Sequence, residues 1–180
     1  NMPLDGLDIM RMGSGGLLKD ILTRPLPRAK ASQPNQSVIK THPDFDKIHA
    51  VILAGGQSKR MGITNKLLAP INGKPMIAIT AEAIVASKAN TLVTVTGFQS
   101  KKLEKVLKGL NIELVHNKYF KDGISSSVVT AVKSAPKDCS AILICLGDMP
   151  KITVAAINQL IEAFNPIEGR AICVPTWQGK

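Results

Sequence analysis

The chain of 180 residues is long enough for one domain with a full hydrophobic core, and 44% hydrophobic with 20% charged residues is the composition of a globular protein. It has no apolar run of the roughly 18–20 residues that a membrane-spanning helix needs. The formal net charge of +10 indicates a polyanionic partner. Because the lysines are dispersed and aromatic residues are few, a small polyanionic substrate fits this charge better than a nucleic acid.

The cysteines indicate the compartment. Cys139, Cys145 and Cys173 show no C-x-x-C spacing, and each lies in or beside an apolar run. This pattern is typical of buried free thiols in a reducing environment. The start of the chain lacks the basic and apolar stretches of a secretory signal. We therefore expect a cytoplasmic protein.

The first 46 residues differ in composition from the rest of the chain. Residues 1–23 contain a Gly-Ser-Gly-Gly run, and residues 24–46 are rich in proline and polar side chains. Such segments bury too little apolar surface to offset the entropy lost on ordering. We predict that residues 1–23 are the remnant of an upstream domain, that 24–46 are a linker, and that 47–180 form an incomplete folded domain.

Beyond the linker, strand-like and helix-like patterns alternate. Short apolar or β-branched runs predict strands over 48–54, 91–96, 112–115, 141–146 and 171–174. Helical spacing of apolar residues predicts helices over 76–87, 100–108, 126–134 and 153–164, the last capped by Thr153. Such alternation indicates an α/β fold of three layers, with a mostly parallel, Rossmann-like sheet between helices. No helix follows the last strand, so we expect the domain to be truncated at the C-terminus.

The first predicted strand leads into the glycine-rich segment Leu53-Ala54-Gly55-Gly56-Gln57-Ser58-Lys59-Arg60-Met61-Gly62, which Asn65 and Lys66 follow. Ligands of open α/β sheets bind beyond the carboxyl ends of the strands. Glycines let backbone N–H groups approach phosphate oxygens, Ser58 offers a hydroxyl, and Arg60 and Lys66 supply cations. The spacing fits neither the dinucleotide-binding fingerprint nor the P-loop. We expect this segment to bind a triphosphate.

An acidic residue follows another predicted strand. Asp148 comes directly after the run 141–146, so its carboxylate is expected in the same crevice as the glycine-rich segment. Mg²⁺ takes few protein carboxylates and completes its shell with phosphates and water, which suits a single Asp here. The alternative is that Asp148 caps the helix that begins near Thr153.

Hydroxyl groups gather before the helix over 126–134. Ser125, Ser126 and Ser127 follow Gly123, and one of the three is expected to cap the helix. Three hydroxyls exceed what capping needs, so the others are candidates for binding a ligand. Gly97, which ends the strand over 91–96, is a further candidate, with a simple strand-ending turn as the alternative.

The run Leu53-Ala54-Gly55-Gly56-x-Ser58-x-Arg60-Met61-Gly62-x-x-x-Lys66 resembles the signature of the molybdenum-cofactor nucleotidyltransferases, the MobA-like NTP transferases. The resemblance extends over roughly residues 48–178 and implies a fold of the nucleotide-diphospho-sugar transferase type. It also implies roles for individual residues. The triphosphate would contact the loop through Leu53, Ala54, Gly55, Gly56 and Ser58, with Arg60 and Lys66 as catalytic cations on the phosphates and Asp148 on Mg²⁺. Gly97, Ser125, Ser126 and Ser127 would lie near the base and ribose.

Members of this family transfer CMP or GMP from a nucleoside triphosphate to the phosphate of molybdopterin, with release of pyrophosphate. Gly55-Gly56 matches guanylyl members, whereas Asn65, the serine run and Asp148-Met149-Pro150 match cytidylyl members. The sequence thus favours CTP, with GTP as the alternative. A sugar-phosphate nucleotidyltransferase is a near relative, and a nucleotide-binding module without chemistry is the non-enzyme alternative. Some proteins that this chain resembles are fused behind a molybdopterin-binding domain, and residues 17–28 of this chain resemble the tail and linker of such a domain. The resemblance also implies an acceptor molybdoenzyme as a partner.

Overall fold

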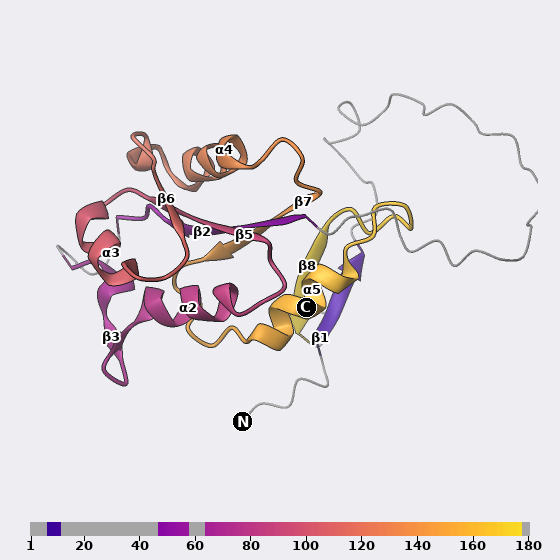
Figure 1. The fold of residues 1–180 in the computed structure, drawn as a ribbon, viewed down its shortest axis with the longest axis horizontal. Coiled ribbons are helices and arrows are strands. Elements are labelled where there is room, and N and C mark those ends of the chain that lie inside the picture. The colour runs from indigo at the N-terminus through magenta and orange to yellow at the C-terminus, as the bar shows by residue number, and fades with distance from the viewer. Residues whose placement is uncertain (1–6, 12–46, 58–63, 178–180) are drawn as a thin grey trace, which may run out of the picture.

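The computed structural model describes residues 7–11, 47–57 and 64–177. Its central sheet is parallel, in the order β6-β5-β2-β7, and consists of β2 (Ile48–Ala54), β5 (Thr91–Thr96), β6 (Glu113–His116) and β7 (Ala141–Leu146). The helices are α2 (Met76–Val85), α3 (Ser100–Leu107), α4 (Ile124–Ser134) and α5 (Val154–Ala163). The predicted α/β architecture with a parallel sheet is confirmed (Figure 1).

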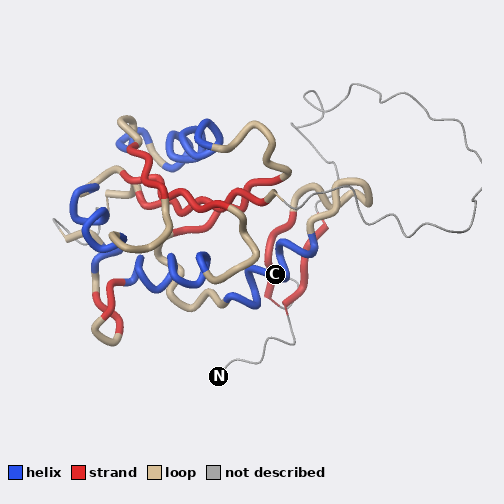
Figure 2. The backbone as a smooth tube through the Cα atoms, in the orientation of Figure 1, coloured by secondary structure: helices blue, strands red, loops and turns tan. Residues whose placement is uncertain are grey.

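Alternate residues of β2 face opposite helical layers. Ala50 and Ile52 belong to a core cluster with residues of α2, α3 and α5, whereas Val51 and Leu53 pack with Ala131 of α4. Figure 2 shows the strands as the middle layer, with α4 on one side and α2 on the other. Because side chains alternate along a strand, a strand that serves both layers must be apolar at nearly every position. This requirement explains the continuous apolar run after His49.

The C-terminal part of the domain differs from the prediction. β7 lies at the edge of the described sheet, and Ile144 is 45% exposed although its strand is entirely apolar. It borders an apolar groove of about 1130 Å³ between β7, α5 and β8 (Cys173–Trp177). The strand predicted over 171–174 therefore does not join the central sheet, because β8 pairs antiparallel with β1 (Leu7–Arg11).

β1 lies within the residues predicted to be an upstream remnant, and the predicted linker over 24–46 lies outside the described residues. The division of the chain at residues 23 and 46 stays a prediction. Among the described residues, no helix has the length and apolar character needed to cross a membrane.

Short elements complete the fold. β3 (Pro70–Ile71) and β4 (Lys74–Pro75) form a hairpin, whose turn residues Asn72 and Gly73 have φ angles of 50° and 80°. Two positive φ angles in a two-residue turn match the right-handed twist of the strands, which explains the Asn-Gly pair. Two 3₁₀ helices, η2 (Lys66–Leu68) and η3 (Phe120–Asp122), precede α2 and α4.

The beginnings of two helices test the predicted caps. The Thr153 hydroxyl accepts a hydrogen bond from the Ala156 backbone N–H at 3.1 Å, so the predicted cap of α5 is confirmed. In contrast, α4 begins two residues earlier than predicted, and its N-cap is Gly123, without a side-chain cap. The expectation that one serine caps α4 is therefore wrong. Gly123 has a φ of 97°, which a glycine adopts without strain, so the serines fall inside the first turn of the helix.

All three cysteines are free thiols, as predicted, but only Cys145 is buried. Burial raises the pKa of the Cys145 thiol to about 11. Cys139 and Cys173 are half-buried, and burial raises the pKa of the Cys173 thiol as well, although Arg170 opposes this.

His49 gives the fold a dependence on pH. The side chain is 2% exposed within β2, Nδ1 lies 2.7 Å from the Thr91 hydroxyl, and Nε2 has no partner among the described residues. Burial lowers the pKa of His49, and the nearby Glu113 carboxylate only partly opposes this. In the unfolded chain, His49 therefore takes up a proton as the pH falls below about 6.5. In the folded protein, the same side chain takes up this proton only at a lower pH.

We expect the free energy of unfolding to be highest above this value and to fall as the pH drops below it. Urea midpoints at pH 7.5 and 5.5 would measure the change, which should be smaller for His49→Gln. The matched control is His116→Gln at the exposed end of β6, which should keep the pH dependence of the parent. An equal pH dependence in all three proteins would contradict the role of His49.

Candidate functional site

A cavity of about 420 Å³ lies beyond the carboxyl ends of β2 and β7. β5 and β6 lie on one side of β2 and β7 on the other, so the cavity marks the point where the order of connection reverses. Open α/β sheets bind their ligands at such a point. The residues predicted from sequence that line it are Leu53, Gly55, Gly56, Lys66, Ser127 and Asp148.

The other residues predicted for the site either do not line this cavity or lie outside the described residues. Ala54, Gly97, Ser125 and Ser126 are described but do not line this cavity. Ser58 and Arg60 lie outside the described residues, so their proposed contacts with phosphate stay predictions.

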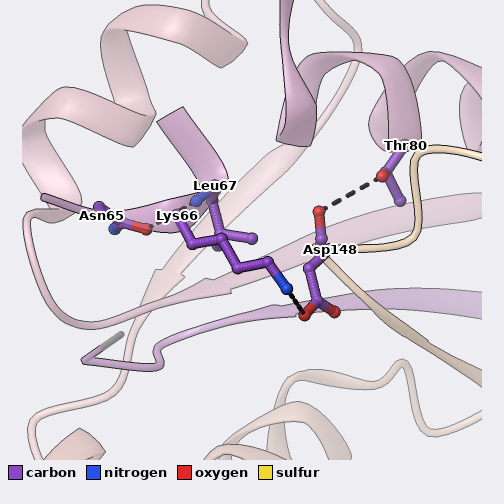
Figure 3. Close-up of polar contacts among 6 residues, drawn as sticks. Asn65, Lys66, Leu67, Thr80 and Asp148 are labelled. Atoms are coloured by element: carbon purple, nitrogen blue, oxygen red, sulfur yellow. Dashed lines mark hydrogen bonds and ion pairs between the residues drawn. The ribbon is translucent and has the colours of Figure 1, made fainter. Parts of the chain in front are cut away.

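One carboxylate and one ammonium group meet at the cavity. Lys66 Nζ lies 3.1 Å from Asp148 Oδ2, and the two side chains are 46% and 38% exposed (Figure 3). Lys66 begins η2, whereas Asp148 follows β7, so the pair joins segments that are 82 residues apart. Because Thr153 caps α5, the alternative role of Asp148 as its cap is excluded.

The backbone beside Asp148 is held by close packing. The Gly147 N–H donates to Leu53 O at 3.1 Å. The buried Thr80 hydroxyl of α2 shares its one hydrogen between Met76 O in its own helix and Gly147 O, each at 3.3 Å, and Figure 3 shows the contact between Thr80 and the backbone before Asp148. A Cβ atom on Gly147 would lie 3.3 Å from both Leu53 O and the Leu67 side chain. The position of the carboxylate is therefore set by β2, α2 and η2 together.

Asn65 holds the backbone beside Lys66 in place through its side-chain hydrogen bonds. Its side chain is fully buried, and Oδ1 accepts from the Leu67 N–H at 3.0 Å (Figure 3). Its Nδ2 donates to Phe98 O at 3.2 Å. An Asp at this position could not donate to Phe98 O and would bury a charge. Asn65 thus fixes the start of η2, and its amide points into the protein.

Gly55 and Gly97 lie where two segments of the backbone pack too closely to leave room for a side chain. A Cβ on Gly55 would lie 2.9 Å from Ser127 Oγ, and a Cβ on Gly97 would lie 2.5 Å from Phe120 Cβ and 2.7 Å from Gly55 O. Gly97 therefore packs against Gly55 and Phe120, two residues that line the cavity. Its glycine identity follows from this packing.

The donor groups fit a divalent cation bound together with phosphates. Asp148 is the one acidic residue among the described residues that line the cavity. The part of the chain that the structure describes holds no cluster of three or more His, Cys, Asp or Glu side chains. A fully protein-ligated metal does not fit this set, whereas Mg²⁺ on one carboxylate, phosphate oxygens and water does.

Sequence reasoning missed several residues of the site. Phe120 and Lys121 of η3 line the cavity, and Lys121 brings a second exposed ammonium group to it. Asn117, which follows β6, contacts two of the serines. Their closeness to the serine run along the chain was the one signal that could have indicated them.

Comparison with known proteins identifies the family of this chain. The model of the MobA-like NTP transferase domain matches residues 50–180. A probable molybdenum cofactor guanylyltransferase from Thermococcus sibiricus is 36% identical over 129 residues, which cover 71% of this chain and 61% of the relative. One from Pyrococcus horikoshii is 33% identical over 131 residues, or 73% of this chain and 63% of that protein.

Among solved structures, a nucleotidyl transferase from Methanothermobacter thermautotroptrophicus superposes with a TM-score of 0.57 at 28% identity, over 65% of this chain and 57% of that one. The chain spans about three fifths of the length of the curated relatives described above. The matched region contains the central sheet except the first two residues of β2, together with the glycine-rich segment and the Lys66–Asp148 pair. The chain belongs to the MobA-like NTP transferase family.

Proposed function

We propose that this chain is a Mg²⁺-dependent nucleotidyltransferase that transfers CMP from CTP to the phosphate of molybdopterin and releases pyrophosphate. The observation that carries the proposal is the Lys66–Asp148 pair, 3.1 Å apart at a cavity that the Gly55-Gly56 backbone also lines. This combination offers N–H donors and a cation to phosphates and a carboxylate to a metal ion. The names of the two curated relatives support molybdopterin as the acceptor.

The chemistry requires little beyond alignment and charge. An oxygen of the acceptor phosphate forms a bond to the α-phosphorus of the nucleotide as the bond to the bridging oxygen breaks, and pyrophosphate leaves with the electron pair. The attacking phosphate is already ionised, so no protein base is needed. The Gly55-Gly56 backbone, Lys66 and Arg60 would orient the triphosphate and offset its charge. Asp148 would hold Mg²⁺, which when bound neutralises charge on the phosphates.

The choice between cytosine and guanine as the base of the nucleotide rests on fewer residues than the sequence analysis used, because Asn65 no longer bears on it. The serine run and Asp148-Met149-Pro150 support CTP. Asn65 bears on the shape of the loop rather than on the base, because its amide is used within the protein. GTP is the second candidate, supported by Gly55-Gly56 and by the names of the guanylyltransferase relatives.

Calorimetric titration with CTP and with GTP, each with and without Mg²⁺, tests both levels of the proposal. We expect Mg²⁺-dependent binding that is tighter for CTP, and Lys66→Ala should weaken it about tenfold through the lost charge on phosphate. Lys74→Ala is the matched control, because Lys74 forms an exposed ion pair with Glu82 outside the cavity. Release of pyrophosphate on addition of molybdopterin then tests the transfer itself.

The outcomes separate the alternatives. Tighter binding of GTP would reassign the base and leave the reaction class in place. Binding without pyrophosphate release would make the chain a nucleotide-binding module. Binding of neither nucleotide would overturn the proposed function.

A further inference from the structure

The serine hydroxyls in the first turn of α4 have different surroundings. Ser125 is exposed. The one hydrogen of the Ser126 hydroxyl has two backbone carbonyls within reach, with Oγ 2.7 Å from Tyr119 O and 2.8 Å from Gly123 O. Ser127 is 5% exposed, lines the cavity and places Oγ against Gly55. Of the three, Ser127 is the one placed to meet a ligand.

A buried amide lies behind these hydroxyls. Asn117 is 1% exposed, and its backbone N–H donates to Thr96 O at 2.9 Å, which joins it to the end of β5. Its Oδ1 accepts from the Tyr119 N–H at 2.9 Å. A backbone N–H can only donate, so the oxygen of the amide must face Tyr119, and the NH₂ group must face the other way.

The NH₂ group of Asn117 therefore controls the direction of the serine hydroxyls. Nδ2 lies 2.9 Å from Ser126 Oγ and 3.1 Å from Ser127 Oγ, and each serine oxygen accepts one of its two hydrogens. The hydrogen of the Ser127 hydroxyl must then point away from Asn117. Among the described residues, this hydroxyl donates to no acceptor, although the side chain is buried. A ligand in the cavity would supply one.

We propose that Asn117 is a positioning residue that holds the Ser127 hydroxyl as a hydrogen-bond donor toward an acceptor oxygen of the bound nucleotide. This inference rests on the proposed function, because it needs a nucleotide in the cavity. It assigns Asn117 no contact with the ligand. Its effect passes entirely through Ser127, which makes the inference testable by combining substitutions.

The test is a double-mutant cycle on CTP affinity in the presence of Mg²⁺. Ser127→Ala removes the donor, and we expect affinity to fall about tenfold, the usual size for one hydrogen bond to a charged or polar ligand. Asn117→Asp keeps the shape but presents an acceptor to Ser127, so the hydroxyl turns back to the carboxylate and affinity falls by a similar factor. In the Ser127→Ala background, Asn117→Asp should cause a smaller loss than in the parent, because only the repulsion between the new carboxylate and the anionic nucleotide remains.

If the role of Asn117 is purely structural, Asn117→Asp should lower CTP affinity equally in the parent and in Ser127→Ala. This result would overturn the inference. Ser134→Ala is the matched control, because its hydroxyl donates to Ala131 O at the far end of the same helix. Thermal unfolding of each variant reports on folding. If Asn117→Asp does not fold, equal affinity of Ser127→Ala and Ser134→Ala for CTP still overturns the inference.

Lys66→Ala separates this inference from the proposed function. If Lys66→Ala weakens binding but Ser127→Ala does not, the inference fails and the proposed function stands. If the unmodified chain binds neither CTP nor GTP with Mg²⁺, both fail together.

Discussion

Replacement of Asp148 by Asn is expected to slow nucleotidyl transfer by roughly 10²–10³-fold while the protein stays folded. The carboxylate is the one acidic group that the described residues bring to the cavity, so an amide in its place leaves the metal ion without its protein ligand. The substitution also removes the negative charge that lies 3.1 Å from Lys66 Nζ. Nucleotide binding should therefore lose its dependence on Mg²⁺, whereas binding without Mg²⁺ should be no weaker than in the parent.

Folding should hardly change, because an ion pair whose side chains are 46% and 38% exposed contributes at most about 1 kcal/mol to stability. Asp138→Asn is the matched control. Asp138 pairs with Lys47 at 2.6 Å, both side chains are exposed, and neither lines the cavity. Pyrophosphate release and calorimetry with varied Mg²⁺ would measure the effects. Parent-like transfer and Mg²⁺ dependence in Asp148→Asn would refute the assigned metal site.

Gly97→Ala is expected to lower the free energy of unfolding by roughly 1–3 kcal/mol, the usual cost of an added methyl group in a packed site. The new Cβ would lie 2.5 Å from Phe120 Cβ and 2.7 Å from Gly55 O, so the backbone at Gly55 and η3 must move away from residue 97. Phe120 and Gly55 both line the cavity. Affinity for the nucleotide should therefore fall together with stability.

Gly56→Ala separates this packing effect from the general cost of replacing a glycine. A Cβ on Gly56 meets nothing within 4 Å, so this variant should unfold at the temperature of the parent. For a chain of this size, Gly97→Ala should lower the melting temperature by roughly 2–4 °C per kcal/mol. Equal melting temperatures for the two variants would show that the contact with Phe120 and Gly55 does not restrict residue 97.

The parts of the fold that were predicted correctly have local causes. β5 and β7 match their predicted bounds, because each is an unbroken β-branched or apolar run with polar residues or glycine at its ends. Thr153 was identified as a cap because its hydroxyl acts three residues along the chain. Gly55, Gly56, Lys66 and Asp148 line one cavity, as expected from the rule that ligand sites of open sheets lie beyond the carboxyl ends of parallel strands, and their roles in binding stay predictions.

The parts that were missed depend on contacts distant along the chain. β8 left the central sheet because its partner is β1, some 170 residues earlier, and no local pattern indicates this pairing. Thr80 reaches Gly147 across 67 residues, and an isolated buried threonine in a helix carries no signal of that contact. Asn117 lies nine and ten residues before its serines, a spacing that belongs to neither helix nor strand periodicity.

Two of the contacts that hold the segment around Asp148 should respond differently to ionic strength. Lys66 and Asp148 are partly exposed, and salt at about 0.1 M screens charges beyond about 10 Å and weakens exposed pairs at shorter range. The Thr80 hydroxyl is buried and its bond to Gly147 O joins two neutral groups, so added salt leaves it unchanged. Added salt should therefore weaken the ion pair between Lys66 and Asp148 while the backbone beneath the carboxylate keeps its place.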